Sequence, residues 1–160
     1  MSNITFRNHV QHSDMQSVKD IVESTNFFYD HEIEVAVELV IEALESKDKS
    51  DYHFIFAEID GKTVGYTCFG PIACTKNSYD IYWIAVHNDY RNQKIGRIIL
   101  EKTENAIKEA GGKGIYLETS STEKYLPTRE FYLRCNYIVE AQIKDFYDSG
   151  DDKVIYVKRF

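Results

Sequence analysis

The sequence predicts one α/β domain over residues 1–160, built on a mixed sheet. Segments with strand periodicity and helix periodicity alternate along the 160 residues, as in α/β proteins. Residues 79–86 (YDIYWIAV) form a nearly uninterrupted apolar run, which is typical of a central strand covered on both faces. A polar loop then leads directly into an amphipathic helix. A chain of this length buries roughly 68–70% of its unfolded surface, so a core needs no partner.

The first 50 residues predict an edge strand followed by two helices. Residues 4–10 alternate weakly between apolar and polar, and Ser13 is a good N-cap for a helix that continues to about Glu23. The segment around Asn26 breaks this helix, and Asp30 is expected to cap the next one. The apolar face of that second helix is Ile33, Val37, Val40, Ile41 and Leu44.

Two strands and a tight turn come next. Residues 53–59 and 63–70 have strand periodicity, and the pair Asp60-Gly61 between them favours a two-residue hairpin turn. The apolar run at 79–86 follows. We expect this run in the middle of the sheet.

The second half of the chain predicts a long helix, a strand, a short helix and a hairpin. The long helix begins near Ile95 and Gly111-Gly112 stop it. A strand covers 114–119, and Pro127 opens the short helix. The final strands, about 137–146 and 153–159, flank the turn Asp148-Ser149-Gly150-Asp151.

Charge and cysteine content limit the partners and the compartment. The formal net charge is −7, which disfavours binding to nucleic acid or to an anionic membrane and suits a cationic substrate. Each of the cysteines Cys68, Cys74 and Cys135 lies in an apolar stretch, so we expect reduced, buried thiols. The chain start lacks the apolar run of a signal peptide. These observations indicate a soluble cytoplasmic protein.

Residues 84–100 (IAVHNDYRNQKIGRIIL) carry the strongest chemical signal. The first N–H groups of a helix have no partner within the helix and favour an anion. Arg91, Lys94 and Arg97 crowd this turn, and Gly96 lets an anion approach the backbone. The motifs GxxxxGK[ST] and GxGxxG do not occur here. From spacing alone, a helix terminus with solvated basic residues explains the pattern equally well.

These residues resemble the acetyl-CoA loop of the GNAT family of N-acetyltransferases, whose pattern is Arg/Gln-x-x-Gly-x-Gly/Ala. Here the loop is Arg91-Asn92-Gln93-Lys94-Ile95-Gly96. The order of elements over nearly the whole chain is also similar, including a short helix with Phe131-Tyr132 before a final hairpin. The resemblance implies a mixed, mostly antiparallel sheet of about seven strands flanked by about four helices. It also implies a splayed central strand and a pyrophosphate-binding loop and helix.

Two positions depart from the family pattern. Lys94 stands where the family has its first loop glycine. If that position requires a positive φ, Lys94 is strained by about 1–3 kcal/mol, although its ammonium group can pair with a phosphate. In the short helix, Tyr125 and Thr128 replace the usual Asn and Ala, which puts one pantetheine contact in doubt.

The resemblance implies acetyl-CoA as co-substrate. The histidines form no HExxH motif and no cluster with cysteines, so we expect no metal. In the family, backbone groups of the central strand bind pantetheine, and amides of the loop bind the pyrophosphate. The implied coenzyme-binding residues are Ile84, Val86, Arg91, Asn92, Gln93, Lys94, Ile95, Gly96 and Arg97. Tyr132 matches the family tyrosine that gives a proton to the departing thiolate. From spacing alone, a core tyrosine is the more common explanation.

Asp80 is the candidate general base. It lies six residues before Val86, where family members with a base on this strand carry Glu, and strand periodicity places both residues on one face. A solvent-exposed Asp at the strand entry is an equal alternative. Glu118 on the next strand, or a chain of waters, are the other candidates for this role.

The acceptor is expected to be a primary amine, on a small molecule or on a protein. The family position of the acceptor implies a wall of aromatic and acidic side chains, which suits an amine on an apolar body. Its members are Phe28, Tyr29, Glu32, Tyr66 and Phe69. The aromatic final hairpin would also permit a homodimer.

The resulting hypothesis is an N-acetyltransferase that moves the acetyl group of acetyl-CoA to an amine by direct attack in a ternary complex. One alternative is a CoA-binding regulatory module on the same fold with weak catalysis. Another is an unrelated α/β domain that binds a phosphate or a protein.

Overall fold

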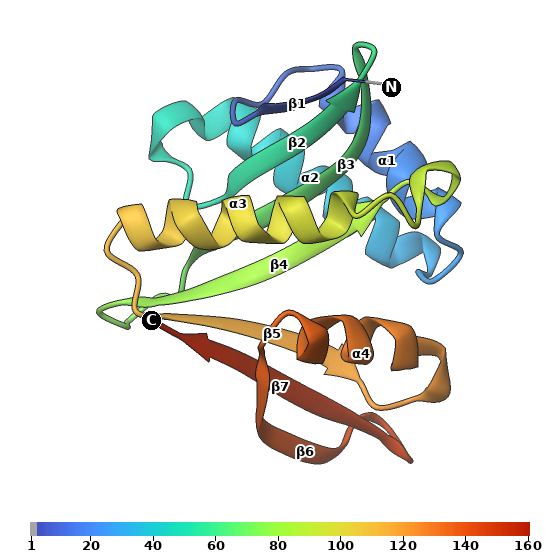
Figure 1. Ribbon diagram of the computed structural model, residues 1–160, viewed down its shortest axis with the longest axis vertical. Helices are drawn as coiled ribbons and strands as arrows, with labels where there is room; N and C mark the ends of the chain where they lie inside the picture. The colour runs from blue at the N-terminus through green and yellow to red at the C-terminus, as the bar shows by residue number, and fades with distance from the viewer. Residues whose placement is uncertain (1–2) are drawn as a thin grey trace. The chain divides into compact units, whose positions relative to one another are not determined.

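The computed structural model describes residues 3–160 and contains a seven-strand mixed sheet in the order β1-β2-β3-β4-β5-β7-β6. The chain forms two compact units, and Figure 1 labels its helices and strands. Unit 1 comprises Met1–Gly70 and Ile81–Ala106, and unit 2 comprises Pro71–Asp80 and Ile107–Phe160. The predicted seven strands and four helices are confirmed.

Three antiparallel strands begin the sheet in unit 1. They are β1 (Ile4–Arg7), β2 (His53–Ile59) and β3 (Lys62–Pro71). Asp60 and Gly61 join the last two with φ angles of 51° and 78°. Two successive positive φ angles define the type I′ turn, so the Asp-Gly prediction is confirmed.

Strand β4 (Ser78–Val86) is fourth in the order of seven, as predicted. It is less covered than its apolar sequence predicts, because only Ile81 and Ala85 are fully buried. The Tyr82 side chain is 38% exposed and its ring lies 5.4 Å from that of Tyr52. The strand is still covered on both faces near its end, with Ala85 in one core cluster and Ile84 and Val86 packed against another, so the prediction holds there and fails at Tyr82.

Helices α1 (Asp14–Ser24) and α2 (Asp30–Ser46) belong to unit 1. Asn26, with a φ of 57°, breaks the chain between them. The expected cap of α2 was one residue too late, because Tyr29 is the N-cap. The reason is local: the Glu32 carboxylate accepts a hydrogen bond from the Tyr29 N–H at 2.8 Å, which fixes the extended backbone of Tyr29.

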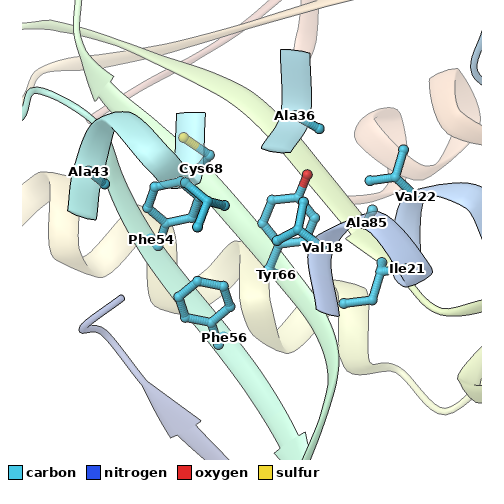
Figure 2. Packing of buried hydrophobic residues seen from close by; sticks show 11 residues of the cluster. Val18, Ile21, Val22, Ala36, Ala43, Phe54, Phe56, Tyr66, Cys68 and Ala85 are labelled. Carbon is cyan, nitrogen blue, oxygen red and sulfur yellow. The ribbon is translucent and has the colours of Figure 1, made fainter. Parts of the chain in front are cut away.

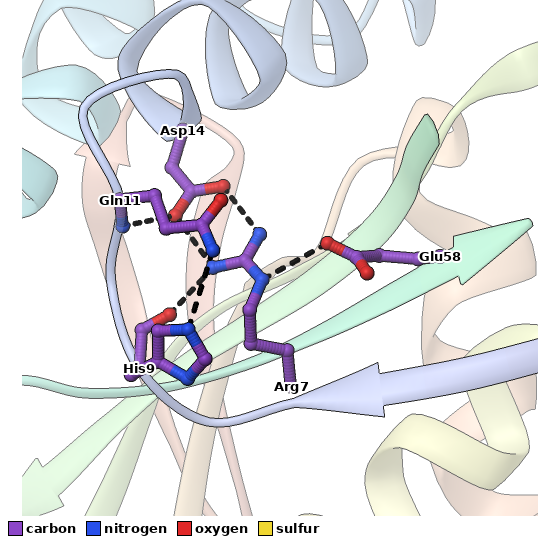
Figure 3. A network of polar contacts seen from close by, with 5 residues as sticks. All are labelled: Arg7, His9, Gln11, Asp14 and Glu58. Carbon is purple, nitrogen blue, oxygen red and sulfur yellow. Dashed lines mark hydrogen bonds and ion pairs between the residues drawn. The ribbon is translucent and has the colours of Figure 1, made fainter. Parts of the chain in front are cut away.

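A buried polar network ties β1 to α1 and explains why the strand predicted over 4–10 ends at Arg7. The Arg7 guanidinium donates to both oxygens of Asp14 at 2.8 Å and to Glu58 at 2.9 Å. Asp14 also accepts from the Gln11 N–H at 2.6 Å, and the Arg7 guanidinium donates to the His9 carbonyl (Figure 3). The chain after Arg7 therefore turns into α1 instead of extending the sheet.

The main core of unit 1 lies where the two helices cover β2 and β3 (Figure 2). Phe54, Phe56 and Tyr66 stack with centroid distances of 5.5–6.3 Å. The Tyr66 side chain is 0% exposed. The other buried members of this cluster are Val18, Ile21, Val22, Ala36, Val40, Ala43, Cys68 and Ala85.

A short 3-10 turn, η1 (Lys47–Lys49), follows α2. A second one, η2 (Asn88–Tyr90), lies between β4 and helix α3 (Ile95–Glu109). The first turns of α3 pack Ile95 and Ile99 onto Ala57, Ile59 and Val64 in a second cluster of unit 1. Gly111, with a φ of 89°, follows the helix end, as the sequence predicts.

Unit 2 contains β5 (Gly114–Ser120), η3 (Glu123–Tyr125), α4 (Leu126–Arg134), β6 (Ile138–Asp148) and β7 (Asp151–Arg159). Ser78–Asp80 of β4 pair with Gly114–Tyr116 in parallel, and β5–β7 and β7–β6 are antiparallel. All positions of β6 are exposed.

The cysteines are free, as expected, but they are not all buried. Cys68 and Cys135 are buried, whereas Cys74 is exposed. The prediction for Cys74 was wrong because the residue lies in the turn after β3, with a φ of 63°, rather than in a strand.

Candidate active site

The loop between β4 and α3 is fixed to the body of unit 1 by main-chain hydrogen bonds. The His87 N–H donates to the Val64 carbonyl at 2.8 Å, and the Tyr90 N–H donates to the His87 carbonyl at 2.9 Å. The Asn88 N–H donates to the Ser24 hydroxyl at the end of α1 at 2.9 Å. The entry to α3 is therefore held by both β3 and α1.

Two residues of this loop have left-handed backbone conformations. Asn92 and Lys94 each have a φ of 63°. Asn adopts this conformation readily, whereas a lysine there costs roughly 1–2 kcal/mol because its Cβ crowds the following carbonyl. The Lys94 carbonyl accepts the first bond of α3, from the Ile98 N–H at 3.1 Å. The strained residue is therefore the one at which the helix starts.

The start of α3 can attract an anion. Its first N–H groups have no partner within a helix, and the dipole places about half a positive charge there. The side chains of Arg91 and Lys94 are exposed. The Arg97 guanidinium donates to Glu101 at 3.2 Å, which leaves its other N–H groups facing solvent. This turn fits a diphosphate held by backbone amides and two or three cations.

Three of the predicted coenzyme-binding residues offer only their backbones. Ile95 is 1% exposed. The side chains of Ile84 and Val86 pack against the second cluster of unit 1, which contains Ala57 and Ile99. The prediction assigned main-chain groups at these positions to the coenzyme, and this role stays a prediction.

Tyr132 lies on α4 in the interior of unit 2. Its side chain is 6% exposed, and its ring lies 6.0 Å from that of Tyr137 and 5.7 Å from that of Tyr156. Burial, followed by the charges of Cys135 and Tyr156, raises the pKa of Tyr132 well above its usual value. The phenol is protonated at neutral pH, as it would be at its ordinary pKa of about 10, and the raised pKa makes it a weaker proton donor than an exposed tyrosine.

Asp80 lies on the other face of the unit 2 sheet. It pairs with Tyr116 of β5, which pairs with Val157 of β7. Tyr156, the neighbour of Val157, faces α4 and contacts Tyr132. Since successive residues of a strand alternate between faces, Asp80 points away from α4. The structure thus separates the two predicted catalytic side chains by the thickness of the sheet.

The Asp80 carboxyl has an altered acidity. Burial, followed by the negative charge of Glu118, raises its pKa to about 6, and Lys153 acts in the opposite direction. Glu118 and Lys153 form an ion pair with a distance of 3.0 Å. Sequence reasoning named Glu118 and missed Lys153, because only the register of β5 with β7 brings the lysine to this face.

The predicted acceptor wall is spread over unit 1. Phe28 packs on Trp83 at 5.0 Å, whereas Tyr29 is 71% exposed. The Glu32 carboxylate is used in capping α2. Tyr66 and Phe69 are buried. The structure does not bring these five side chains to one surface, and their role stays a prediction.

A surface cavity of about 410 Å³ lies at the end of α1. None of the predicted site residues lines it. Its lining residues are Ser17, Asp20, Ile21, Glu23, Ser24, Lys62, Thr63 and His87.

Within residues 3–160, no group of three or more His, Cys, Asp or Glu side chains is placed to hold a metal ion. No helix in the same range is long and apolar enough to cross a membrane.

The comparisons agree on one family. The model of the GNAT acetyltransferase family matches residues 15–137. A solved structure assigned to a GNAT acetyltransferase from Desulfovibrio desulfuricans has 41% identity and a TM-score of 0.97, over 98% of this chain and 99% of that one. Comparison with curated proteins gave no match.

More distant structures share the fold. An aminoglycoside 6'-N-acetyltransferase complexed with coenzyme A has 16% identity and a TM-score of 0.76, over 98% of this chain and 96% of that one. The ribosomal-protein-S18-alanine N-acetyltransferase from Escherichia coli has 16% identity and a TM-score of 0.73, over 99% and 94%. With the family model and the 41% identical structure, the sequence and the loop at α3 lead to one conclusion: the chain belongs to the GNAT family of acetyltransferases.

Proposed function

We propose that the protein is an N-acetyltransferase that moves the acetyl group of acetyl-CoA to a primary amine by direct attack in a ternary complex. The observation that carries the proposal is the loop of residues 91–97, where exposed cations surround the free amides that open α3. A neighbour with the same fold is complexed with coenzyme A, which supports acetyl-CoA as the co-substrate.

The loop accounts for the coenzyme's charge. The amides from Gln93 to Arg97 would hold the diphosphate, with Arg91 and Lys94 as counter-charges. Main-chain groups of Ile84 and Val86 would bind pantetheine. Acetyl-CoA supplies the activated acyl carbon, and the chain supplies orientation and proton transfer.

Asp80 and Tyr132 are the proposed groups for proton transfer. Amide formation requires a base to take a proton from the attacking amine and an acid to protonate the thiolate. The pKa of Asp80 is raised to about 6. The carboxyl group is therefore ionised at neutral pH, and its pKa is close enough to the working pH for an effective base. Tyr132 is the acid, because a phenol is protonated at neutral pH and its position on α4 matches the family tyrosine. Asp80 lies on the opposite face of the sheet, so one of the two groups would act through water. Glu118 and a chain of waters are the alternatives to Asp80.

Replacement of Tyr132 tests the mechanism. Tyr132→Phe removes one hydroxyl from a packed ring, so we expect kcat to fall by about 10²-fold with unchanged coenzyme A affinity in calorimetry. Tyr137→Phe is the matched control, because Tyr137 is a buried neighbour at 1% exposure. Unchanged kcat in Tyr132→Phe would remove Tyr132 from the mechanism.

Release of free thiol from acetyl-CoA across a panel of amines tests the activity itself. The panel contains small-molecule amines and peptide N-termini, because neighbours of this fold are named for aminoglycoside and for protein substrates. Coenzyme A binding without thiol release for any amine would favour the regulatory alternative. Absence of binding would exclude both.

The exposed edge of the sheet at β6 bears on the assembly of the protein. Strand β6 is an edge strand exposed along its length, and an uncovered edge favours pairing with a second copy. We propose a homodimer, which sedimentation at micromolar concentration tests: a mass of 18.7 kDa would exclude it. The free cysteines support a cytoplasmic location.

A further inference from the structure

Asp80, Glu118 and Lys153 share the face of the unit 2 sheet that lies opposite α4. Asp80 pairs with Tyr116, and Glu118 lies two residues further along the same strand. Ser120 pairs with Lys153, so strand alternation places Lys153 on this face too. The register of three strands therefore brings one base candidate, one further carboxylate and one ammonium together.

The lysine is enclosed rather than solvated. The Lys153 ammonium lies 3.0 Å from the Glu118 carboxylate, and the side chains are 15% and 47% exposed. The ring of Phe146 covers the ammonium at 4.1 Å from the ring centroid. A lysine held between a carboxylate and an aromatic ring keeps its charge at a fixed position.

An irregularity in β6 supplies the aromatic cover. Ile143 pairs with Lys153, but the next pair is Asp148 with Asp151, so the residues between them leave the ladder. Asp145, with a φ of 52°, forms this bulge. Its N–H donates to Asp152 at 2.9 Å and its carboxylate accepts from the Gly150 N–H at 2.8 Å. The bulge is thus held by hydrogen bonds on both sides.

We infer that Lys153 and Glu118 are positioning residues that set the protonation of Asp80 in acetyl transfer, Glu118 favouring the protonated carboxyl and Lys153 the ionised one. The inference rests on the proposed function, in which Asp80 is the base. The two residues act on the Asp80 pKa in opposite directions. Other titratable groups of unit 2 on this face are Tyr116, Tyr147, Asp151 and Arg159, the last of which pairs with Gly114 and is engaged by Glu140. Burial, followed by the charges of Glu118 and Asp151, raises the pKa of Tyr147.

The opposite signs make a discriminating experiment. Lys153→Met keeps the stem under Phe146 and removes the charge, so the acid limb of the kcat/KM profile moves to higher pH. Glu118→Gln moves the limb to lower pH. A displacement of about half a pH unit, or roughly a twofold change in kcat/KM near pH 6, is the expected size in each direction. The double variant returns toward the wild-type limb.

Lys144→Met is the matched control, because it removes an ammonium from the same hairpin at an exposed position and should leave the limb in place. Glu118 is half exposed, so Glu118→Gln keeps the fold and is sufficient by itself if Lys153→Met does not fold. Limbs that stay in place, or that move in the same direction in both single variants, would overturn the inference.

Two further measurements separate this inference from the proposed function. If Asp80→Asn keeps the acid limb of the wild type, the assignment of the base is wrong. NMR titration of the Asp80 carboxyl carbon in the wild type and the two single variants needs no turnover. Opposite displacements of that titration support the coupling whatever the reaction, and identical titrations refute it.

Discussion

Lys94 is the residue at which the coenzyme loop departs from the family pattern, and its φ of 63° makes the cost of that departure measurable. A side chain in the left-handed region costs roughly 1–2 kcal/mol, and glycine loses about 0.5–1 kcal/mol more conformational entropy on folding than alanine. The difference predicts that Lys94→Gly is more stable than Lys94→Ala by roughly 0.5–1 kcal/mol.

Thermal unfolding measures this difference. For a chain of this size it corresponds to a melting temperature about 1–4 °C higher for Lys94→Gly than for Lys94→Ala. Both variants lack the ammonium group, so the comparison isolates the strain of the Cβ from the charge. A Lys94→Ala protein as stable as Lys94→Gly would refute the argument that this position is strained.

Coenzyme A affinity measures the charge in the same two variants. If the exposed Lys94 ammonium pairs with the diphosphate, both variants lose affinity by about twofold to fivefold, and added salt reduces the loss. An affinity that differs between the variants would instead indicate that loop conformation, and not charge, controls binding.

Two further predictions concern stability. Asp14→Asn removes one of the two ionic partners of the buried Arg7 guanidinium, whose side chain is 8% exposed, and leaves Glu58. We expect the free energy of unfolding to fall by about 3 kcal/mol in urea titrations, the lower end of the usual cost of breaking a buried ion pair. Asp20→Asn on the exposed side of α1 is the control, and a similar loss in both would contradict the role of the network. Asp80→Asn should raise the melting temperature at neutral pH more than at pH 4. Its folded pKa of about 6 lies above the unfolded value, so the charged carboxyl destabilises the fold as pH rises through this range. Equal gains at both pH values would contradict this sign.

Local signals in the sequence predicted the features that local physics determines. The turn at Asp60-Gly61 needed only two residues that tolerate positive φ, and both have it. The helix containing Tyr132 begins at Leu126 with Pro127 in its first turn, because proline is well suited to that position. The loop and helix after β4 likewise follow from a change of periodicity within one short stretch.

Features that depend on distant pairing could not be predicted. The ion pair of Lys153 with Glu118 depends on which strand lies beside β5 and in which register. The contact of Arg7 with Glu58 joins residues 51 positions apart. The exposure of Cys74 reflects a turn conformation that an apolar stretch does not reveal. In each case the amino acid types were ordinary, and only the three-dimensional arrangement gave them partners.

Tyr132 and Asp80 lie on opposite faces of the unit 2 sheet, so at most one of them reaches the reacting atoms directly and the other acts through water. On one face, a phenol and a carboxylate could hydrogen-bond to each other, and neither group would then be free to exchange a proton with the substrate. Here the sheet separates them, and each has a different environment: aromatic rings around Tyr132, and an ion pair near Asp80. Burial raises the pKa of both groups, which makes the phenol a weaker proton donor and brings the pKa of the carboxyl close to neutrality. One sheet therefore provides an acid and a base whose protonation states are controlled independently.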